Sequence, residues 1–448
     1  MATNQPARRL PRKLGTWTGM AVVIGVIIGS GIFRVPSPIA MQTGSITGVA
    51  LVWILGGIVA LFGALSIAEL AAMFPHAGGP YVYLREAYGR PLAFLFGWMW
   101  LLTTPFSWAA QSLTFAEYFG GVMHYGRLPT HLIAAALIAL ICAAHYRSVR
   151  MGAVVQNIST GAKLLALLGL AVVLFVFAPH AGSTLAGVAS GSVSWSGIGI
   201  ALVAVLWAYD GWENLTTLSG EMRNPQTSLP RALIAGTLVV IAVYLVVNAG
   251  YLVALPFAAL AASKSVAADA VTGVLGQGGA AVVAALVMVS TFGSLNGSIL
   301  SDPRVFYAMA EDGLFFKSVG RIHARFETPY VAIAFTGVLA VIYVLLQDFL
   351  QLAAAYVLGI WPFLALAVIG LFLLRRRRPE LPRPYRVLGY PLVPALFVLG
   401  TLVVIGNSLY RDPLNTGRSL AITLLGVPLY FIWNFYYKRR HTGADPAV

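Results

Sequence analysis

The stretch IIGSGIF, residues 27–33, interrupts an apolar run that extends from residue 17 to residue 42. The run is long enough to cross a lipid bilayer, for which about 20 apolar residues are needed. Gly29 and Gly31 flank Ser30 near its middle. Unwound backbone at membrane depth is tolerated only where it lines a cavity. The stretch therefore predicts a membrane-spanning helix that breaks at a binding site.

The rest of the chain has the same membrane character. Of its 448 residues, 59% are hydrophobic and 10% are charged, and the mean hydropathy is +0.82, whereas soluble domains carry roughly 25% charged residues. We therefore expect an all-α polytopic membrane protein. We interpret 256–279 as an external loop with short helices. The apolar runs predict twelve transmembrane helices, at 17–42, 46–73, 88–120, 129–146, 153–178, 196–220, 229–255, 280–310, 329–346, 350–374, 391–409 and 416–437.

The formal net charge is +14, and the lysines and arginines responsible for it lie mostly in or beside the predicted loops. If the amino terminus is cytoplasmic, about 23 lysines and arginines lie in or beside inside segments, as the positive-inside rule predicts. The outside segments hold only Arg127, Lys264, Arg411 and Arg418. This asymmetry explains the positive charge without nucleic acid. It favours a plasma membrane protein, in a bacterium the inner membrane, with both termini cytoplasmic.

A second break signal, WAYDGWE at residues 207–213, lies in the predicted sixth span. Glycine-interrupted spans at matching positions of two repeats indicate a transporter binding site. A helix that starts after Gly31 presents free amides, which suit a carboxylate. A helix that ends near residues 207–210 presents free carbonyls, which suit an ammonium group. Together they suit a zwitterionic α-amino acid. The alternative is that Gly29 and Gly31 merely allow close helix packing.

Several stretches, in this order and spacing, carry a resemblance to a known family. They are GSGIFRVPSPIA at 29–40, AELAAMFPHAGGPYVYLREAYG at 68–89, AYDGWENLTTLSGEMRNP at 208–225, NGSILSDPRVFYAMAEDGLFF at 296–316, HARFETPYVAI at 323–333 and RRRRPELPRPYRVLGYP at 376–391. The sequence resembles the amino acid–polyamine–organocation superfamily, most closely its L-amino acid transporter type with the bacterial exchangers.

The resemblance implies a LeuT-like fold of 5+5 inverted repeats with broken helices 1 and 6. The expected organisation is a cytoplasmic tail at 1–13, repeat one at 14–178, repeat two at 196–374, helices 11 and 12 at 391–437, and a cytoplasmic tail at 438–448.

The resemblance also implies residue roles. Amides around Ser30 and Gly31 would hold the carboxylate, and carbonyls of three residues, Ile27, Trp207 and Asp210, would hold the amino group. Glu213 matches a gating glutamate of relatives. The full set expected to bind substrate is Ile27, Gly29, Ser30, Gly31, Trp207, Tyr209, Asp210, Gly211, Trp212 and Asn296.

Two charged residues within spans allow more than one interpretation. Lys163 resembles a lysine that replaces a sodium ion in sodium-independent relatives, so we expect sodium-independent transport; a proton-carrying role and a merely structural role are the alternatives. Asp210 either favours cationic substrates or points away and bonds to backbone.

The expected function is secondary active transport of small to medium neutral L-amino acids, by exchange or proton-linked uptake. A cationic amino acid or polyamine permease is the alternative, and an amino-acid-sensing receptor is a remote one. An enzyme is disfavoured because no span holds a paired histidine–carboxylate motif. A channel is disfavoured because no filter or charge ring is visible.

The expected partners are the amino acid substrate and the lipid bilayer. The single cysteine, Cys142, lies within the predicted fourth span, so an internal disulfide is impossible. Animal relatives use an external cysteine between spans three and four to bind a heavy chain. We therefore expect no covalent heavy chain, no nucleic acid and no cofactor, and a monomer or weak homodimer.

Overall fold

The computed structural model describes residues 10–177, 194–276, 278–346 and 349–442. All regular elements within these ranges are helical, apart from one isolated bridge between Leu14 and Met222. The elements are α1 (Thr16–Ile27), α2 (Gly31–Arg34), α3 (Pro36–Thr43), α4 (Ile46–Met73), α5 (Pro80–Tyr88), α6 (Arg90–Met123), α7 (Arg127–Arg147), α8 (Val149–Phe177), α10 (Trp195–Tyr209), α11 (Asn214–Thr217), η1 (Ser219–Glu221), α12 (Pro225–Ala254), α13 (Phe257–Ala262), α14 (Val266–Leu275), α15 (Gly278–Ser301), α16 (Pro303–Glu311), α17 (Tyr330–Leu346), α18 (Phe349–Arg377), α19 (Leu392–Arg411) and α20 (Pro413–Thr442).

Ten helical segments of the described chain are long and apolar enough to cross a membrane. The predicted sixth and ninth spans correspond to the shorter apolar helices α10 and α17. Length and composition therefore support a multi-pass membrane protein without establishing a count of twelve. The loop predicted at 256–279 contains the short helices α13 and α14. Parts of the predicted tails, 1–9 and 443–448, lie outside the described residues, as does residue 178 at the end of the predicted repeat one.

Several predicted boundaries differ from the structure for local reasons. The fifth span starts four residues early, at Val149, where the Ser148 hydroxyl accepts a hydrogen bond from Met151 N at 3.1 Å. Such side-chain caps favour a helix start. The eighth span, predicted as continuous, divides at Asp302 into α15 and α16. Pro303 is the first residue of α16, a position where its missing N–H costs no hydrogen bond.

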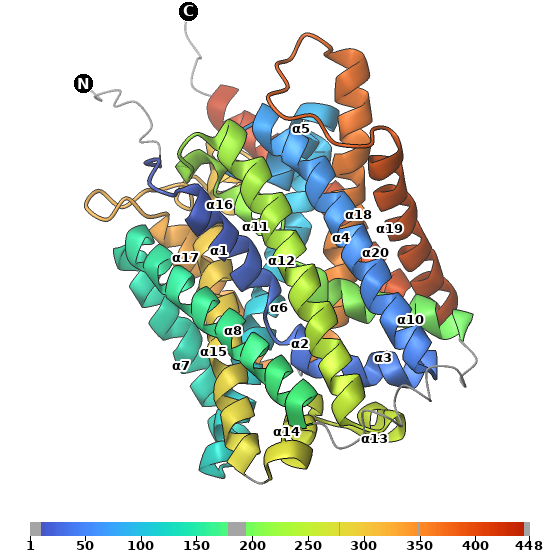
Figure 1. The fold of residues 1–448 in the computed structure, drawn as a ribbon. Coiled ribbons are helices and arrows are strands. Elements are labelled where there is room, and N and C mark those ends of the chain that lie inside the picture. The colour runs from blue at the N-terminus through green and yellow to red at the C-terminus, as the bar shows by residue number, and fades with distance from the viewer. Residues whose placement is uncertain (1–9, 178–193, 277, 347–348, 443–448) are drawn as a thin grey trace, which may run out of the picture.

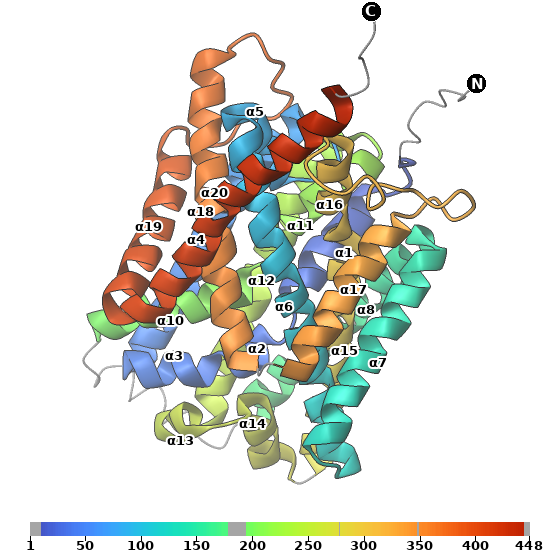
Figure 2. The same ribbon diagram turned by 180° about the vertical axis from the view of Figure 1, so that it is seen from behind.

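The broken first helix lies inside the bundle. Helix α1 packs against α12, α8 and α15, and α10 packs against α3, α4 and α19. Figures 1 and 2 show α19 and α20 along one side of the molecule, where many of their side chains are exposed. The start of α1 and the end of α20 lie at the same end of the bundle (Figures 1 and 2). We call this end the N-terminal face.

At the N-terminal face, backbone hydrogen bonds join the residues before α1 to the segment from η1 to α12. Leu14 N donates to the carbonyl of Glu221 at 2.9 Å, and Arg223 N donates to the carbonyl of Leu14 at 2.8 Å. Lys13 Nζ lies 2.6 Å from Glu327 in the segment before α17. These contacts hold the start of α1 against the segment that follows the second break and against the segment before α17.

Candidate binding site between the broken helices

The two predicted breaks are present and lie against each other. Helix α1 ends at Ile27 and α2 starts at Gly31, while α10 ends at Tyr209 and α11 starts at Asn214. A Cβ atom at Gly31 would lie 2.7 Å from Ala208 Cα. The glycine thus permits both the break and close packing, so the two interpretations of this position are compatible.

Gly211 is required by the second break. Its φ of +107° lies in a region that residues with a side chain rarely adopt. A Cβ atom there would also lie 2.6 Å from Val26 Cγ1. Both breaks are therefore built around glycines that face the other broken helix.

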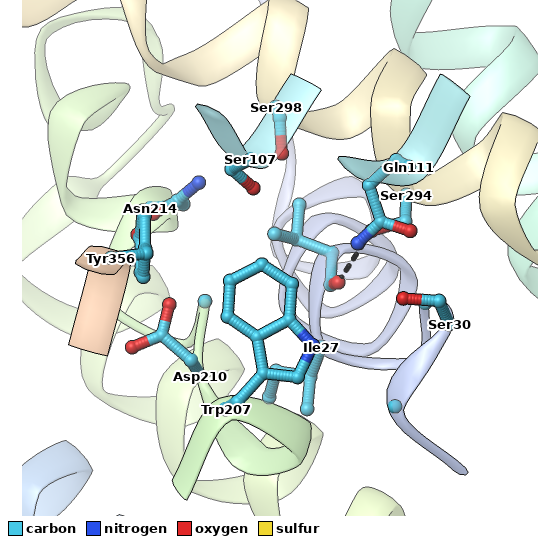
Figure 3. A pocket seen from close by; sticks show the side chains of 14 residues that line it. Ile27, Ser30, Ser107, Gln111, Trp207, Asp210, Asn214, Ser294, Ser298 and Tyr356 are labelled. Atoms are coloured by element: carbon cyan, nitrogen blue, oxygen red, sulfur yellow. Dashed lines mark hydrogen bonds between the residues drawn. The ribbon is translucent and has the colours of Figure 1, made fainter. Parts of the chain in front are cut away.

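A small cavity lies between the breaks and is completed by α6, α15 and α18. Figure 3 shows the side chains of Ser107, Gln111 and Ser298 converging on it opposite Asp210 and Trp207. Its volume is about 20 Å³, about the space that one water needs and less than any amino acid needs. The cavity is therefore too small for an amino acid in this conformation. Its lining comprises Val26, Ile27, Gly29, Ser30, Gly31, Ser107, Gln111, Trp207, Asp210, Gly211, Asn214, Ser294, Ser298 and Tyr356.

Three polar atoms of lining residues are buried without a hydrogen-bond partner in the described part of the chain. They are Ser30 Oγ, Gln111 Oε1 and Asn214 Oδ1. Buried polar groups of folded proteins are nearly always paired. In addition, no acceptor is found among the described residues for the backbone N–H groups of Ser30 and Gly31. This arrangement fits a small polar ligand.

Carbonyl oxygens of the broken helices are held by neighbouring hydroxyls. Tyr244 Oη lies 2.9 Å from the Ile27 carbonyl and 3.1 Å from the Ala208 carbonyl, so it bridges the two breaks. Ser294 Oγ donates to the Val26 carbonyl at 2.8 Å. Helices α12 and α15 thereby fix the geometry of the break.

Lys163 of α8 is fully buried beside the first break. Its ammonium group donates to the carbonyls of Gly25 at 2.9 Å, Ile28 at 2.7 Å and Ser290 at 2.9 Å. An ammonium group has three donors, and here each has an acceptor. Lys163 therefore joins α8, the end of α1 and α15.

Three buried carboxylates lie close to the second break. Asp210 lines the cavity and accepts a hydrogen bond from Trp361 Nε1 at 2.8 Å. Asp302 accepts from Trp108 Nε1 and from Asn214 Nδ2, both at 2.8 Å. Both carboxylate oxygens of Glu213 are buried and lack a partner within the described chain, although Glu213 does not line the cavity.

The structure brings most of the predicted substrate residues to the cavity, but not all. Tyr209, Trp212 and Asn296 do not line it. The Tyr209 ring packs 5.8 Å from Trp53, and the Trp212 ring packs 6.2 Å from Phe397. Asn296 is hydrogen-bonded to His145 at 2.9 Å and to Gln156 at 2.8 Å. Substrate binding by these three residues stays a prediction.

Seven lining residues were absent from the predicted set: Val26, Ser107, Gln111, Asn214, Ser294, Ser298 and Tyr356. Ser107 and Gln111 are four residues apart, as are Ser294 and Ser298, so each pair shares one helix face. This spacing of polar residues within apolar spans is visible in the sequence and could have indicated both pairs.

Comparisons with known proteins found similar sequences over nearly the whole chain. The model of a family described as amino acid permease matches residues 14–432. The serine/threonine exchanger SteT of Bacillus subtilis is 33% identical, over 94% of this chain and 97% of its own. The human b(0,+)-type amino acid transporter 1 is 33% identical, over 96% and 89%. The human cystine/glutamate transporter is 32% identical, over 97% and 88%.

Proposed function

The chain belongs to the amino acid permease family and is a multi-pass amino acid transporter rather than an enzyme, and we propose that it exchanges small to medium neutral L-amino acids without sodium. A relative that covers nearly the whole chain is named a serine/threonine exchanger. The polar lining of the cavity is compatible with a small polar substrate once the cavity has opened. Proton-linked uptake is the alternative mode of coupling.

The observation that carries the proposal is the set of unpartnered polar groups in the cavity. The substrate carboxylate accepts hydrogen bonds from the amides of Ser30 and Gly31 and from the Ser30 hydroxyl. The substrate ammonium group meets carbonyls at the end of α10, near Trp207, and at the end of α1. Gln111 and Asn214 remain to contact the substrate side chain.

Transport requires this cavity to open on each side in turn. The cavity is too small for an amino acid as it stands. At the N-terminal face, backbone hydrogen bonds join Leu14, before α1, to Glu221 and Arg223, after the second break. Release at that face therefore requires these hydrogen bonds to break. Sodium independence rests on Lys163, whose ammonium group occupies the carbonyl cluster where a cation would bind. Glu213 is the candidate gating residue.

Counterflow in proteoliposomes tests the proposal. Vesicles loaded with unlabelled serine or threonine should accumulate the labelled amino acid, and replacing sodium with choline should not change the rate. Unloaded vesicles with an inward proton gradient should accumulate little. A requirement for sodium, or uptake that depends on the proton gradient and not on internal substrate, would contradict sodium-independent exchange.

A second candidate function, transport of cationic amino acids, is favoured by one observation. Asp210 places a carboxylate at the cavity, where its hydrogen-bond partners, Trp361 and Tyr356, are both uncharged. The variant D210N keeps the shape and removes the charge. If Asp210 receives a cationic side chain, D210N loses lysine and arginine exchange while serine exchange remains. If wild-type protein does not exchange lysine or arginine, this candidate is excluded.

We further propose the organisation that the sequence predicts. Residues 14–178 and 196–374 form inverted repeats, and both termini are cytoplasmic in a protein of the plasma membrane. The chain works as a monomer or weak homodimer without a covalent heavy chain, because Cys142 lies within α7 against Gly337. Impermeant labelling of single cysteines introduced at Thr442 and Asp269 tests the topology. A disulfide-linked partner on a non-reducing gel would contradict the last proposal.

A further inference from the structure

A second hollow lies on the outer surface of the bundle, away from the substrate cavity. It has a volume of about 710 Å³ and lies between α7, the first turn of α8 and α17. No residue of its lining is shared with the substrate cavity. We call it the α7–α17 groove. It is lined by Leu140, Cys142, Ala143, Ala144, Tyr146, Arg147, Met151, Tyr330, Ile333 and Ala334.

Along α7, the side chains that line the groove change from apolar to aromatic to charged. Leu140 and Ala143 are exposed side chains at the apolar end, and Arg147 ends the helix. At 1.5 Å per residue, Leu140 and Arg147 are roughly 10 Å apart along the axis. Tyr146 lies between them, as expected of aromatic side chains at a membrane interface. By this rule we expect the apolar end of the groove in the hydrocarbon and the aromatic and charged end at the interface.

The charged end of the groove lies at the N-terminal face. Thr328 Oγ1 donates to the Tyr146 carbonyl at 2.8 Å, which holds the segment before α17 against the end of α7. The neighbouring Glu327 is bound by Lys13, at 2.6 Å. The ring of Tyr146 also packs 5.7 Å from that of Phe326. These contacts place the end of α7 beside the chain that precedes α1.

The mouth of the groove is positively charged. Arg147 and Arg150 are exposed, and neither forms an ion pair within the described chain. Arg325 Cζ lies 5.6 Å from the centre of the Phe326 ring, which adds a third cation near Tyr146. The nearby acidic residue Glu327 is neutralised by Lys13. An anionic group would therefore find cations without a competing carboxylate.

We propose that the α7–α17 groove binds an acidic phospholipid from the leaflet at the N-terminal face. One acyl chain lies along the apolar floor between α7 and α17, and the phosphate meets Arg147 and Arg150. Basic pockets between transmembrane helices at the cytoplasmic side bind anionic headgroups in this way. The apolar floor distinguishes a lipid from a free phosphate, and the unpaired arginines distinguish an acidic lipid from a zwitterionic one.

Lipid retention by purified full-length protein tests the proposal. Native mass spectrometry measures the binding of phosphatidylglycerol and of phosphatidylcholine to wild type, to R147Q/R150Q and to the matched control R376Q/R377Q. The control removes the same charge from two exposed arginines of α18. A juxtamembrane arginine contributes about 1 kcal/mol, so R147Q/R150Q should bind phosphatidylglycerol roughly 30-fold more weakly. Wild type and the control should keep a preference for phosphatidylglycerol.

A second pair of variants tests the apolar floor. A143W fills the groove, whereas A421W places the same side chain on the exposed face of α20. A143W should lose phosphatidylglycerol binding and A421W should keep it. Equal binding by R147Q/R150Q and wild type, or an equal preference of wild type for phosphatidylcholine, would overturn the proposal. So would competition by millimolar inorganic phosphate, which would indicate a free-anion site. If A143W does not fold, phosphatidylglycerol binding by R147Q/R150Q and its control still tests the proposal.

Discussion

The ammonium group of Lys163 donates a hydrogen bond to the Ile28 carbonyl at 2.7 Å, at the point where α1 unwinds. Ile28 is the first residue after α1, so its carbonyl has no partner within a helix. The same ammonium group reaches Gly25 and Ser290. One side chain of α8 thus holds the end of α1 against α15 and supports the cavity wall formed by Gly29 and Ser30.

Replacing Lys163 should disrupt transport more than it disrupts membrane insertion. K163A removes three hydrogen bonds to buried carbonyls, of which that of Ile28 keeps the Ser290 hydroxyl as a donor at 3.1 Å, at a cost of roughly 3 kcal/mol. We expect exchange in proteoliposomes to fall at least roughly tenfold, with a lower thermal unfolding midpoint. The matched control K264A removes an exposed lysine and should behave as wild type. Full activity of K163A would show that the lysine does not hold the break.

The two breaks were predictable because glycines interrupt two predicted spans at matching positions of the two expected repeats. Gly31 and Gly211 mark breaks that tertiary structure then places in contact. The residues that α6, α15 and α18 contribute to the cavity were less predictable, because they depend on which face of each helix turns inward. On α15, Ser294 and Ser298 face the cavity, whereas Asn296, two residues away and thus about 200° around the helix, bonds to α7 and α8.

Gly31 and Gly161 differ in the space available for a side chain: Gly31 contacts Ala208, whereas Gly161 has no close neighbour. In G31A the new methyl group would lie 2.7 Å from Ala208 Cα, a backbone atom that cannot move alone. We expect a cost of roughly 1–3 kcal/mol and loss of exchange, because the shift separates the two breaks. In G161A nothing lies within 4 Å of the new atom, and alanine favours a helix by about 0.5–1 kcal/mol. Equal exchange rates of G31A and G161A would contradict the close contact.

Gln111 should contribute to substrate affinity and not to folding. Its Oε1 atom is buried at the cavity without a partner in the described chain. Q111L removes that atom at similar volume, so we expect unchanged or slightly higher thermal stability. Loss of one buried hydrogen bond to substrate costs about 1–3 kcal/mol, which weakens apparent affinity roughly 5- to 150-fold. The exposed control Q226L should keep both properties. Lower stability of Q111L with unchanged affinity would assign Gln111 a structural role.

Glu69 should matter for stability although it lies away from the cavity. It is fully buried on α4, and its carboxylate accepts from Arg375 Nε at 2.9 Å, Arg375 Nη2 at 2.6 Å and Val387 N at 2.7 Å. It thereby joins α4 to the end of α18 and to the segment before α19. Breaking a buried ion pair by removing one partner costs roughly 3–5 kcal/mol, so E69A should unfold at a clearly lower temperature.

The control for this last prediction is E380A, which removes an exposed carboxylate from the same segment of chain. An exposed substitution of this kind changes stability by less than about 0.5 kcal/mol. E69Q keeps the shape and the capacity to accept from Val387 N, so it should fall between E69A and wild type. Thermal unfolding in detergent measures all three, and exchange at a temperature where each stays folded separates stability from transport. If E69A and E380A unfold at the same temperature, the bonds from Glu69 to Arg375 and Val387 contribute nothing measurable to the stability of the fold.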